Sequence, residues 1–234
     1  MCFTFLQTDI FLTVNSMNII FEDEELVVAE KPVGVLSEGE KEDCMPFRLK
    51  EVCGGEIYTV HRLDRGVGGI MVYARTQFAA RELSKQIAQR SLEKVYLALL
   101  HGQPEESSGR LEDLLFKDSS KNKTYVVKRE RKGVKKAALT YETLCAGSYH
   151  EAVLTLVRIR LETGRSHQIR VQFASRKNPL FGDGKYGSTD NEKNIALWSY
   201  SLSFFHPKTK EHLTFTLTPP EDSLFGKTGC LQAI

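Results

Sequence analysis

One aspartate of this chain stands among cations in a pattern that suits chemistry. Asp64 lies between Arg62 and Arg65, and a glycine-rich turn and an apolar run at residues 70–74 follow it. Such a run after a turn predicts a buried strand, with the aspartate on the loop beside it. Loops held by a rigid strand are common positions for active sites, and a carboxylate there could act as a nucleophile or as a base.

Two other interpretations of the same residues have to be weighed. Asp64 could simply pair with a neighbouring arginine on a solvated turn, without any function. The string His-Arg-Leu-Asp at residues 61–64 is also similar to the catalytic loop of protein kinases. Kinases place an asparagine where this chain has Gly69, and the sequence lacks the other kinase motifs. Phosphoryl transfer therefore has almost no support. Other motifs must decide whether Asp64 belongs to an active site or to a surface ion pair.

Apolar periodicity predicts the elements that position Asp64. Thr76 is expected to cap a helix, and a second helix is expected near residues 168–173 because Ile169 and Phe173 lie one turn apart. Residues 37–55 show no sustained period and are predicted to be a mobile connection with one helical turn. Strands are predicted at residues 18–21, 26–31, 70–74, 94–100, 137–144, 152–161, 195–205 and 213–218.

The composition is that of an ordinary globular protein. Of the 234 residues, 41% are hydrophobic and 26% are charged, and the net charge of +2 means that an anionic partner needs a local basic patch. The five cysteines form no Cys-x-x-Cys pair and indicate reduced thiols in the cytoplasm. No apolar run is long enough to span a bilayer. Residues 1–16 lack the basic region of a signal peptide and are predicted to be a disordered or wrongly assigned extension.

A basic patch lies between Lys117 and Lys136. This segment holds nine Lys or Arg residues and two acidic ones. Such a run either binds phosphates or is only a solvated hairpin, and both interpretations stay open. If it binds phosphates of a nucleic acid backbone, the candidate residues are Lys128, Arg129, Arg131 and Lys132.

Six short motifs occur in one order along the chain. They are Lys-Pro-x-Gly at 31–34, His-Arg-Leu-Asp at 61–64, Lys-x-Tyr-x-Ala at 94–98, Gly-Arg-x-His-Gln-Ile-Arg at 164–170, Gly-Asp-x-Lys-Tyr-Gly at 182–187 and His-Pro at 206–207. In this order the chain resembles the RluA-type pseudouridine synthases from about residue 18 to residue 220. So many motifs in register are not expected by chance.

The resemblance implies an isomerase that converts uridine in ribosomal or transfer RNA to pseudouridine, without a metal or another cofactor. It places Asp64 at the position of the essential aspartate and Tyr96 at that of the active-site tyrosine. Arg62 matches the residue that replaces the flipped-out uridine in the RNA stack, and Ile169 matches an apolar residue under the base. A buried tyrosine or isoleucine is by default part of the core, and for Ile169 the two interpretations are hard to separate.

The resemblance also implies that Arg165 is the counter-charge of Asp64. A carboxylate in the floor of a cleft tends to take up a proton, whereas a guanidinium within about 4 Å keeps it ionised. We therefore expect Arg165 to contact Asp64 and Tyr96 to face the same pocket. Arg62 should point toward the RNA.

The chain differs from the family pattern in three places. Val67-Gly68-Gly69 stands where the family commonly has Thr-Ser-Gly, and Trp198 holds a position that is often histidine. The RNA-binding module that many relatives carry ahead of the catalytic domain is not expected here. These differences concern the substrate and not the reaction.

The sequence therefore predicts one catalytic domain of α+β type, with a bent, mostly antiparallel mixed sheet, flanking helices and an RNA-binding cleft. The domain is predicted to span residues 17–222, with a tail at 223–234, and to act as a cytoplasmic monomer on RNA. One competing hypothesis is a non-catalytic RNA-binding protein on the same scaffold, which would tolerate the loss of Asp64 or Tyr96. The other is a glycosidase, which needs two carboxylates, and no second acid is predicted beside Asp64.

Overall fold

The computed structural model describes residues 17–150, 152–190 and 192–234, and the predicted extension at residues 1–16 lies outside them. Its strands are β1 (Ile19–Glu22), β2 (Leu26–Lys31), β3 (Tyr58–Thr59), β4 (Gly68–Ala74), β5 (Glu93–His101), β6 (Ser108–Asp118), β7 (Lys123–Val127), β8 (Val134–Tyr149), β9 (Ala152–Leu161), β10 (Leu197–Phe205) and β11 (His212–Thr216). Its helices are α1 (Met45–Cys53), α2 (Gln77–Gln89), α3 (Gln168–Ala174) and α4 (Leu224–Lys227), with 3-10 helices η1 (Gly184–Tyr186) and η2 (Cys230–Ala233).

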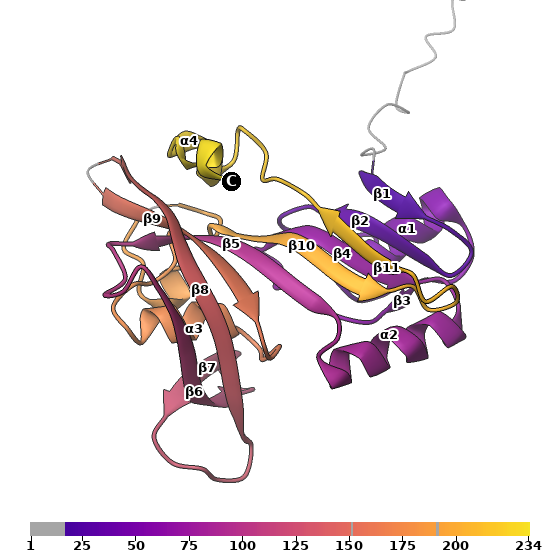
Figure 1. Cartoon of the computed structure of the whole chain (residues 1–234), viewed down its shortest axis with the longest axis horizontal. Helices are drawn as coiled ribbons and strands as arrows, with labels where there is room; N and C mark the ends of the chain where they lie inside the picture. Colours follow the sequence, from indigo (N-terminus) through magenta and orange to yellow (C-terminus); the bar gives the residue numbers. More distant parts are fainter. Residues whose placement is uncertain (1–16, 151, 191) are drawn as a thin grey trace, which may run out of the picture.

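The strands form one long sheet that bends across the molecule (Figure 1). Its order is β1-β2-β4-β10-β5-β9-β8-β6-β7, with β11 paired to β10 and β3 paired to β4. Among the strands of the described ranges, β4 and β10 run parallel and every other pair is antiparallel. The predicted α+β fold with a mixed, mostly antiparallel sheet is confirmed.

The part of the sheet around β2 and β4 is buried on both faces. Alternate residues of a strand point to opposite faces, and here they join two apolar clusters: Val27, Ala29, Met71 and Tyr73 on one face, and Leu26, Val28, Ile70 and Val72 on the other. Helix α1 contributes to the first cluster and α2 to the second. The strand that follows the Asp64 loop is therefore fixed from both sides.

Helix α2 begins where the sequence predicts. The Thr76 side chain accepts a hydrogen bond from the Ala79 backbone N–H at 3.0 Å and so caps the first turn. Helix α1 is longer than predicted, because Met45 and Leu49 anchor it to the core and Pro46 stands in its first turn. The segment at 37–55 is thus a packed helix with an approach loop, and not a connection with a single helical turn.

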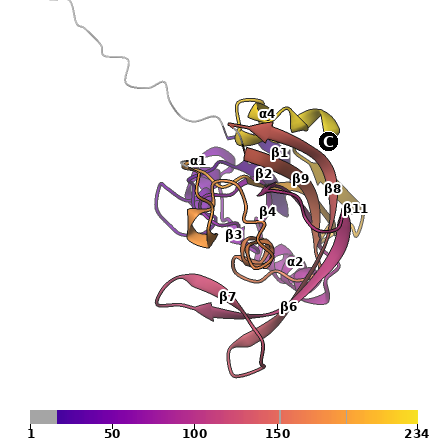
Figure 2. The same ribbon diagram turned by 90° about the vertical axis from the view of Figure 1, so that its left-hand side faces the viewer.

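The hairpin of β6 and β7 projects toward one end of the molecule, and α3 lies inside the curve of the sheet (Figures 1 and 2). Strand β6 was not predicted, because charged residues interrupt its apolar pattern and only Leu111 and Leu115 are buried along it. At the C-terminus, α4 and η2 bury Phe225 and Cys230 in an apolar cluster with β5, β9 and Trp198. Residues within the predicted tail are therefore packed against the sheet.

Candidate active site

The Asp64 loop connects β3 to β4 and is held on both sides of the aspartate by the segment after β2. Ser37 Oγ accepts a hydrogen bond from Leu63 N at 2.9 Å and donates one to Leu63 O at 2.7 Å. Gly34 N donates to Arg65 O at 2.8 Å, and Arg65 Nε donates to Gly34 O at 2.8 Å. The backbone before and after Asp64 is fixed, which limits the directions open to its side chain.

Lys31 supports the same loop from inside the protein. It is fully buried, and its ammonium group donates to Val35 O at 2.7 Å, Pro32 O at 3.0 Å and Arg65 O at 3.3 Å. Burial lowers the pKa of Lys31 to about 8, although the charge of Asp64 acts in the opposite direction. The lysine of the Lys-Pro-x-Gly motif thus ties the end of β2 to the Asp64 loop, a role that the sequence did not predict.

The counter-charge of Asp64 is Arg170. Nη1 of Arg170 donates to Oδ2 of Asp64 at 2.7 Å, while its Nε and Nη2 donate to the two carboxylate oxygens of Asp183 at 2.7 and 2.8 Å. Arg165 instead donates from Nε to Lys136 O at 3.0 Å. No ion pair joins Arg165 to Asp64 in the described part of the chain. The predicted contact between Arg165 and Asp64 is therefore wrong.

The position of α3 explains this correction. Arg170 lies within the helix and is only 6% exposed, whereas Arg165 precedes it and its backbone N–H donates to Gln168 Oε1 at 3.0 Å. The motif at 164–170 contains both arginines, and Arg165 was predicted to be the partner of Asp64. Ile169 was expected to lie under the base, and Arg170 is the next residue in the chain. This was the signal in the sequence that favoured Arg170 as the partner of Asp64.

Asp183 is the second carboxylate at this site, which the sequence analysis did not expect. Burial by itself lowers the pKa of Arg170, but hydrogen bonds and charges from Asp183 and Asp64 raise it above its ordinary value. The Asp183 side chain is 1% exposed, and both of its oxygens accept hydrogen bonds from Arg170. The Asp64 side chain is 28% exposed. The arrangement thus presents one carboxylate to a substrate and buries the other as its support.

His167 is a further polar neighbour of Asp64, and no role was predicted for it from the sequence. Its Nε2 lies 3.7 Å from Oδ2 of Asp64, and its Nδ1 forms a hydrogen bond of 2.8 Å with the Tyr186 hydroxyl. Burial lowers the pKa of His167 below its ordinary value, although the charge of Asp64 acts in the opposite direction. The backbone of His167 has φ of 54°, in the left-handed region that few non-glycine residues adopt. Such strain is common where a side chain must be aimed at a site.

Asp64 opens into a cavity of about 1,330 Å³. Tyr96 and Ile169, which are 5% and 4% exposed, line the same cavity together with Leu197. Burial raises the pKa of Tyr96, and the nearby Asp64 charge adds to this effect. The structure therefore brings Asp64, Tyr96 and Ile169 together, as predicted, in a space with both charged and apolar walls.

The remaining predicted residues lie farther out. Arg62 also lines the cavity and forms an exposed ion pair of 2.6 Å with Glu38. The four candidate backbone residues of the basic patch do not line it: Lys128, Arg129, Arg131 and Lys132 are exposed between β7 and β8. The guanidinium of Arg131 packs over the Phe116 ring, 4.6 Å from its centre.

Neither a cluster of metal ligands nor a long apolar helix occurs in the described ranges. Within residues 17–150, 152–190 and 192–234, no group of three or more His, Cys, Asp or Glu side chains is arranged to hold a metal ion. In the same ranges, no helix has the length and apolar character needed to cross a bilayer.

Comparison with known proteins gives consistent matches. The family model described as RNA pseudouridylate synthase matches residues 25–175. An "Uncharacterized RNA pseudouridine synthase" of Aquifex aeolicus is 33% identical over 88% of this chain and 70% of its own length. The "Dual-specificity RNA pseudouridine synthase RluA" of Vibrio vulnificus is 35% identical over 82% and 78%. The structure of human RNA pseudouridylate synthase domain containing 1 has a TM-score of 0.75 over 92% and 87% of the two chains; at 23% identity this similarity shows the fold.

Proposed function

Because the chain belongs to the RNA pseudouridine synthase family, as a member of RluA type, we propose that it isomerises specific uridines of ribosomal or transfer RNA with Asp64 as the essential group. Enzymes of this family are isomerases that convert uridine to pseudouridine in RNA. The observation that carries the assignment to Asp64 is its position. It is a partly exposed carboxylate at a cavity, paired with a buried arginine that a second carboxylate holds in place.

The reaction breaks the bond between C1′ of the ribose and N1 of uracil, and forms a bond between C1′ and C5. The proton on C5 is lost and N1 gains one, so no atoms are lost overall. An ionised carboxylate can start this reaction as a nucleophile or as a base. Arg170 suits Asp64 for either role, because a charge-assisted hydrogen bond to one oxygen stabilises the carboxylate while the rest of the group stays open to the cavity.

The walls of the cavity suit a planar base. Tyr96 and Ile169 offer a ring and an apolar side chain beside Asp64, and such surfaces hold a base that has left its stack. Since burial raises the pKa of Tyr96, its hydroxyl stays protonated at neutral pH. We therefore assign Tyr96 to holding the base, and not to carrying negative charge.

A uridine within folded RNA has to leave its stack to reach Asp64. Arg62 stands at the exposed side of the same cavity, and its guanidinium can stack on a neighbouring base as an ammonium group could not. In this proposal Arg62 fills the space that the uridine leaves, while Lys128, Arg129, Arg131 and Lys132 add contacts to the RNA backbone. The enzyme acts as a monomer in the cytoplasm, where these RNAs occur.

A glycosidase remains the competing enzyme class only if a second carboxylate can reach a sugar. Asp183 lies on the other side of Arg170, but both of its oxygens are bound to that guanidinium and its side chain is 1% exposed. The other carboxylates that line the cavity are paired with exposed arginines: Glu38 with Arg62, Glu93 with Arg160 and Glu162 with Arg110. Asp64 is the lining carboxylate that pairs with a buried arginine, and this arrangement fits uridine isomerisation better than hydrolysis by two acids.

Mapping of pseudouridines in a strain that lacks the gene tests this function. We expect one or a few uridines of ribosomal or transfer RNA to remain unmodified in that strain, and a plasmid copy of the wild-type gene to restore them. A copy carrying Asp64→Asn should not restore them. An unchanged map in the deleted strain would contradict the proposal.

A further inference from the structure

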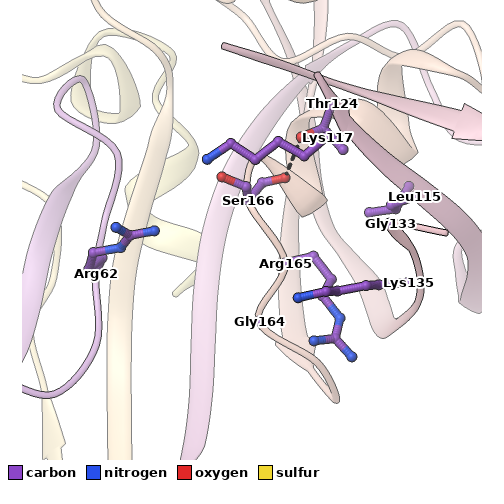
Figure 3. A pocket seen from close by; sticks show the side chains of 9 residues that line it. All are labelled: Arg62, Leu115, Lys117, Thr124, Gly133, Lys135, Gly164, Arg165 and Ser166. Atoms are coloured by element: carbon purple, nitrogen blue, oxygen red, sulfur yellow. Dashed lines mark hydrogen bonds between the residues drawn. The ribbon is translucent and has the colours of Figure 1, made fainter. Parts of the chain in front are cut away.

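A smaller cavity of about 300 Å³ opens beside the catalytic cleft (Figure 3). Four cations line it, namely Arg62, Lys117, Lys135 and Arg165, and no carboxylate of residues 17–150, 152–190 and 192–234 does. Figure 3 shows Arg62 on one side of the cavity and the other three cations opposite to it. Arg62, Lys117 and Arg165 also line the cavity that contains Asp64, so the two spaces adjoin.

The pairing of the strands places the two lysines on one side of the projecting hairpin. Leu115 and Lys117 are two residues apart on β6 and therefore point to the same face. Lys135 of β8 pairs directly with Leu115, and Thr124 of β7 pairs directly with Lys117. Directly paired residues share a face, so all four side chains face the loop that precedes α3.

That loop is tied to the hairpin at two points. Thr124 Oγ1 donates to Ser166 O at 2.9 Å, as Figure 3 shows, and Arg165 Nε donates to Lys136 O at 3.0 Å. The second bond fixes the guanidinium of Arg165 at the cavity. Its two terminal nitrogens have no hydrogen-bond partner among residues 17–150, 152–190 and 192–234.

Of the four cations of this cavity, Arg62 is paired with Glu38, and the charges of the other three are not neutralised by an ion pair among the described residues. Over the same described ranges, Lys117, Lys135 and Arg165 have no ion-pair partner, whereas the nearby Lys136 pairs with Glu130 at 3.5 Å. Three cations that line one cavity without ion-pair partners create a local positive potential that favours an anion. A guanidinium with free terminal N–H groups can donate two parallel hydrogen bonds to the oxygens of a phosphate.

We propose that Lys117, Lys135 and Arg165 form a seat for one phosphate of the RNA strand, beside the nucleotide that enters the catalytic cleft. This inference rests on the proposed function, because it takes RNA as the ligand. The seat recognises a phosphate at one fixed position relative to Asp64, since its cavity adjoins that of the aspartate. The hairpin cations Lys128, Arg129, Arg131 and Lys132 differ in this respect, because they lie on an exposed connection and can contact any nearby phosphate.

Binding of an RNA hairpin with a single uridine in its loop tests the seat. All proteins carry Asp64→Asn, so that turnover does not affect the measurement. Replacement of Lys117, Lys135 and Arg165 by Gln should weaken binding more than tenfold at moderate salt and lower the log–log salt slope by roughly 0.7 for each phosphate that the protein no longer neutralises. The matched control replaces Arg81, Lys85 and Lys227, exposed cations that line neither cavity. Equal affinities and slopes for the two triple variants would overturn the proposal.

A second measurement tests whether the seat holds one particular phosphate. The same hairpin is prepared with one neutral methylphosphonate linkage at a time, and with the adjoining 2′-hydroxyl methylated in every RNA. One linkage should be much more sensitive than the others with intact cations, and this sensitivity should disappear in the variant of Lys117, Lys135 and Arg165. A variant of the four hairpin cations should retain it. Equal sensitivity at all linkages, or sensitivity that survives in the variant of the seat, would refute a phosphate seat.

The two proposals can fail separately. If binding responds as expected but the wild-type enzyme forms no pseudouridine in any RNA, the seat holds and the proposed function is wrong. If the wild-type enzyme is active but RNA binding does not depend on the three cations, the proposed function holds and the phosphate seat is wrong.

Discussion

At the scale of single residues, Arg170 connects the reactive carboxylate to its support. Replacement by Gln would remove the guanidinium that pairs with both Asp64 and the buried Asp183. Loss of one member of a buried ionic group destabilises a protein by roughly 3–5 kcal/mol, and misplacement of a catalytic group costs about a hundredfold in rate. We expect Arg170→Gln to show both effects in urea unfolding and in single-turnover tritium release from C5.

Two further variants keep this prediction testable if Arg170→Gln folds poorly. Arg170→Lys preserves the charge but cannot bind both carboxylates, so it should fold and still lose most of its kcat. Arg165→Gln should raise KM for RNA while kcat at saturating RNA changes little. A loss of kcat in Arg165→Gln as large as that in Arg170→Lys would show that Arg165 takes part in catalysis.

The exchange of Arg165 for Arg170 shows where sequence reasoning stops. The chemistry of Asp64 requires a guanidinium, and residue types alone predict that correctly. Which of the two arginines reaches it depends on the angle of α3, and the residues of this ion pair are 106 positions apart in the chain. Asp183 was missed for a related reason, because its partner lies on a different element.

At the scale of elements, the departures from the family pattern at Gly68 and Trp198 have one structural cause. Gly68 of β4 pairs with Trp198 of β10, and a Cβ at position 68 would lie 2.5 Å from Cζ3 of the indole. The indole is also held by a hydrogen bond of 2.7 Å from its N–H to Leu217 O. The serine common in the family cannot fit beside this tryptophan, which explains why both positions depart from the pattern together.

We therefore predict coupling between positions 68 and 198. Gly68→Ser should lower the free energy of unfolding by roughly 1–3 kcal/mol through overpacking, and most of this cost should vanish when Trp198 is replaced by His. Gly69→Ala is the matched control. Its backbone has φ of 116° and an added Cβ would meet the backbone of Ser199, so the same replacement should not rescue it. Additive effects of Gly68→Ser and Trp198→His in urea unfolding would contradict this explanation.

The elements differ in how far local pattern predicts them. Strands with continuous or alternating apolar residues were located to within a few positions, as was the helix capped by Thr76. Strand β6 was missed because its pairing with β7 and β8 makes it a strand, although five of its eleven residues are charged. The small cavity depends on that register. The basic segment from Lys117 to Lys136 was recognised in the sequence, but its pattern could not show that Lys117 and Lys135 face one cavity together with Arg165.

At the scale of the whole molecule, His61 makes stability depend on pH. It is buried, with 7% of its surface exposed. Its Nε2 accepts a hydrogen bond from Val72 N at 3.2 Å, and Nδ1 has no partner among the described residues. Burial lowers the pKa of His61 well below its ordinary value. The folded protein therefore keeps His61 neutral, whereas the unfolded chain binds a proton as the pH falls below about 6.5.

The sign of this effect follows from proton linkage. Between the lowered pKa and about 6.5 the unfolded state binds more protons, so stability is present above this range and is lost as the pH falls through it. From pH 7 to pH 5 we therefore expect wild-type protein to lose more stability than His61→Gln. Equal losses in denaturant titrations at the two pH values would show that His61 is protonated in the fold.

The central claim is that the Asp64 carboxylate performs the isomerisation. Asp64→Asn keeps the shape of the side chain and removes the charge, and Arg170 keeps its bidentate pair with Asp183, so the variant should fold and bind RNA. Release of tritium from RNA labelled at C5 of uridine measures turnover directly. The wild-type enzyme should release it from the RNA identified by mapping, and Asp64→Asn should release none above background. Release by the variant at a tenth or more of the wild-type rate would contradict the claim.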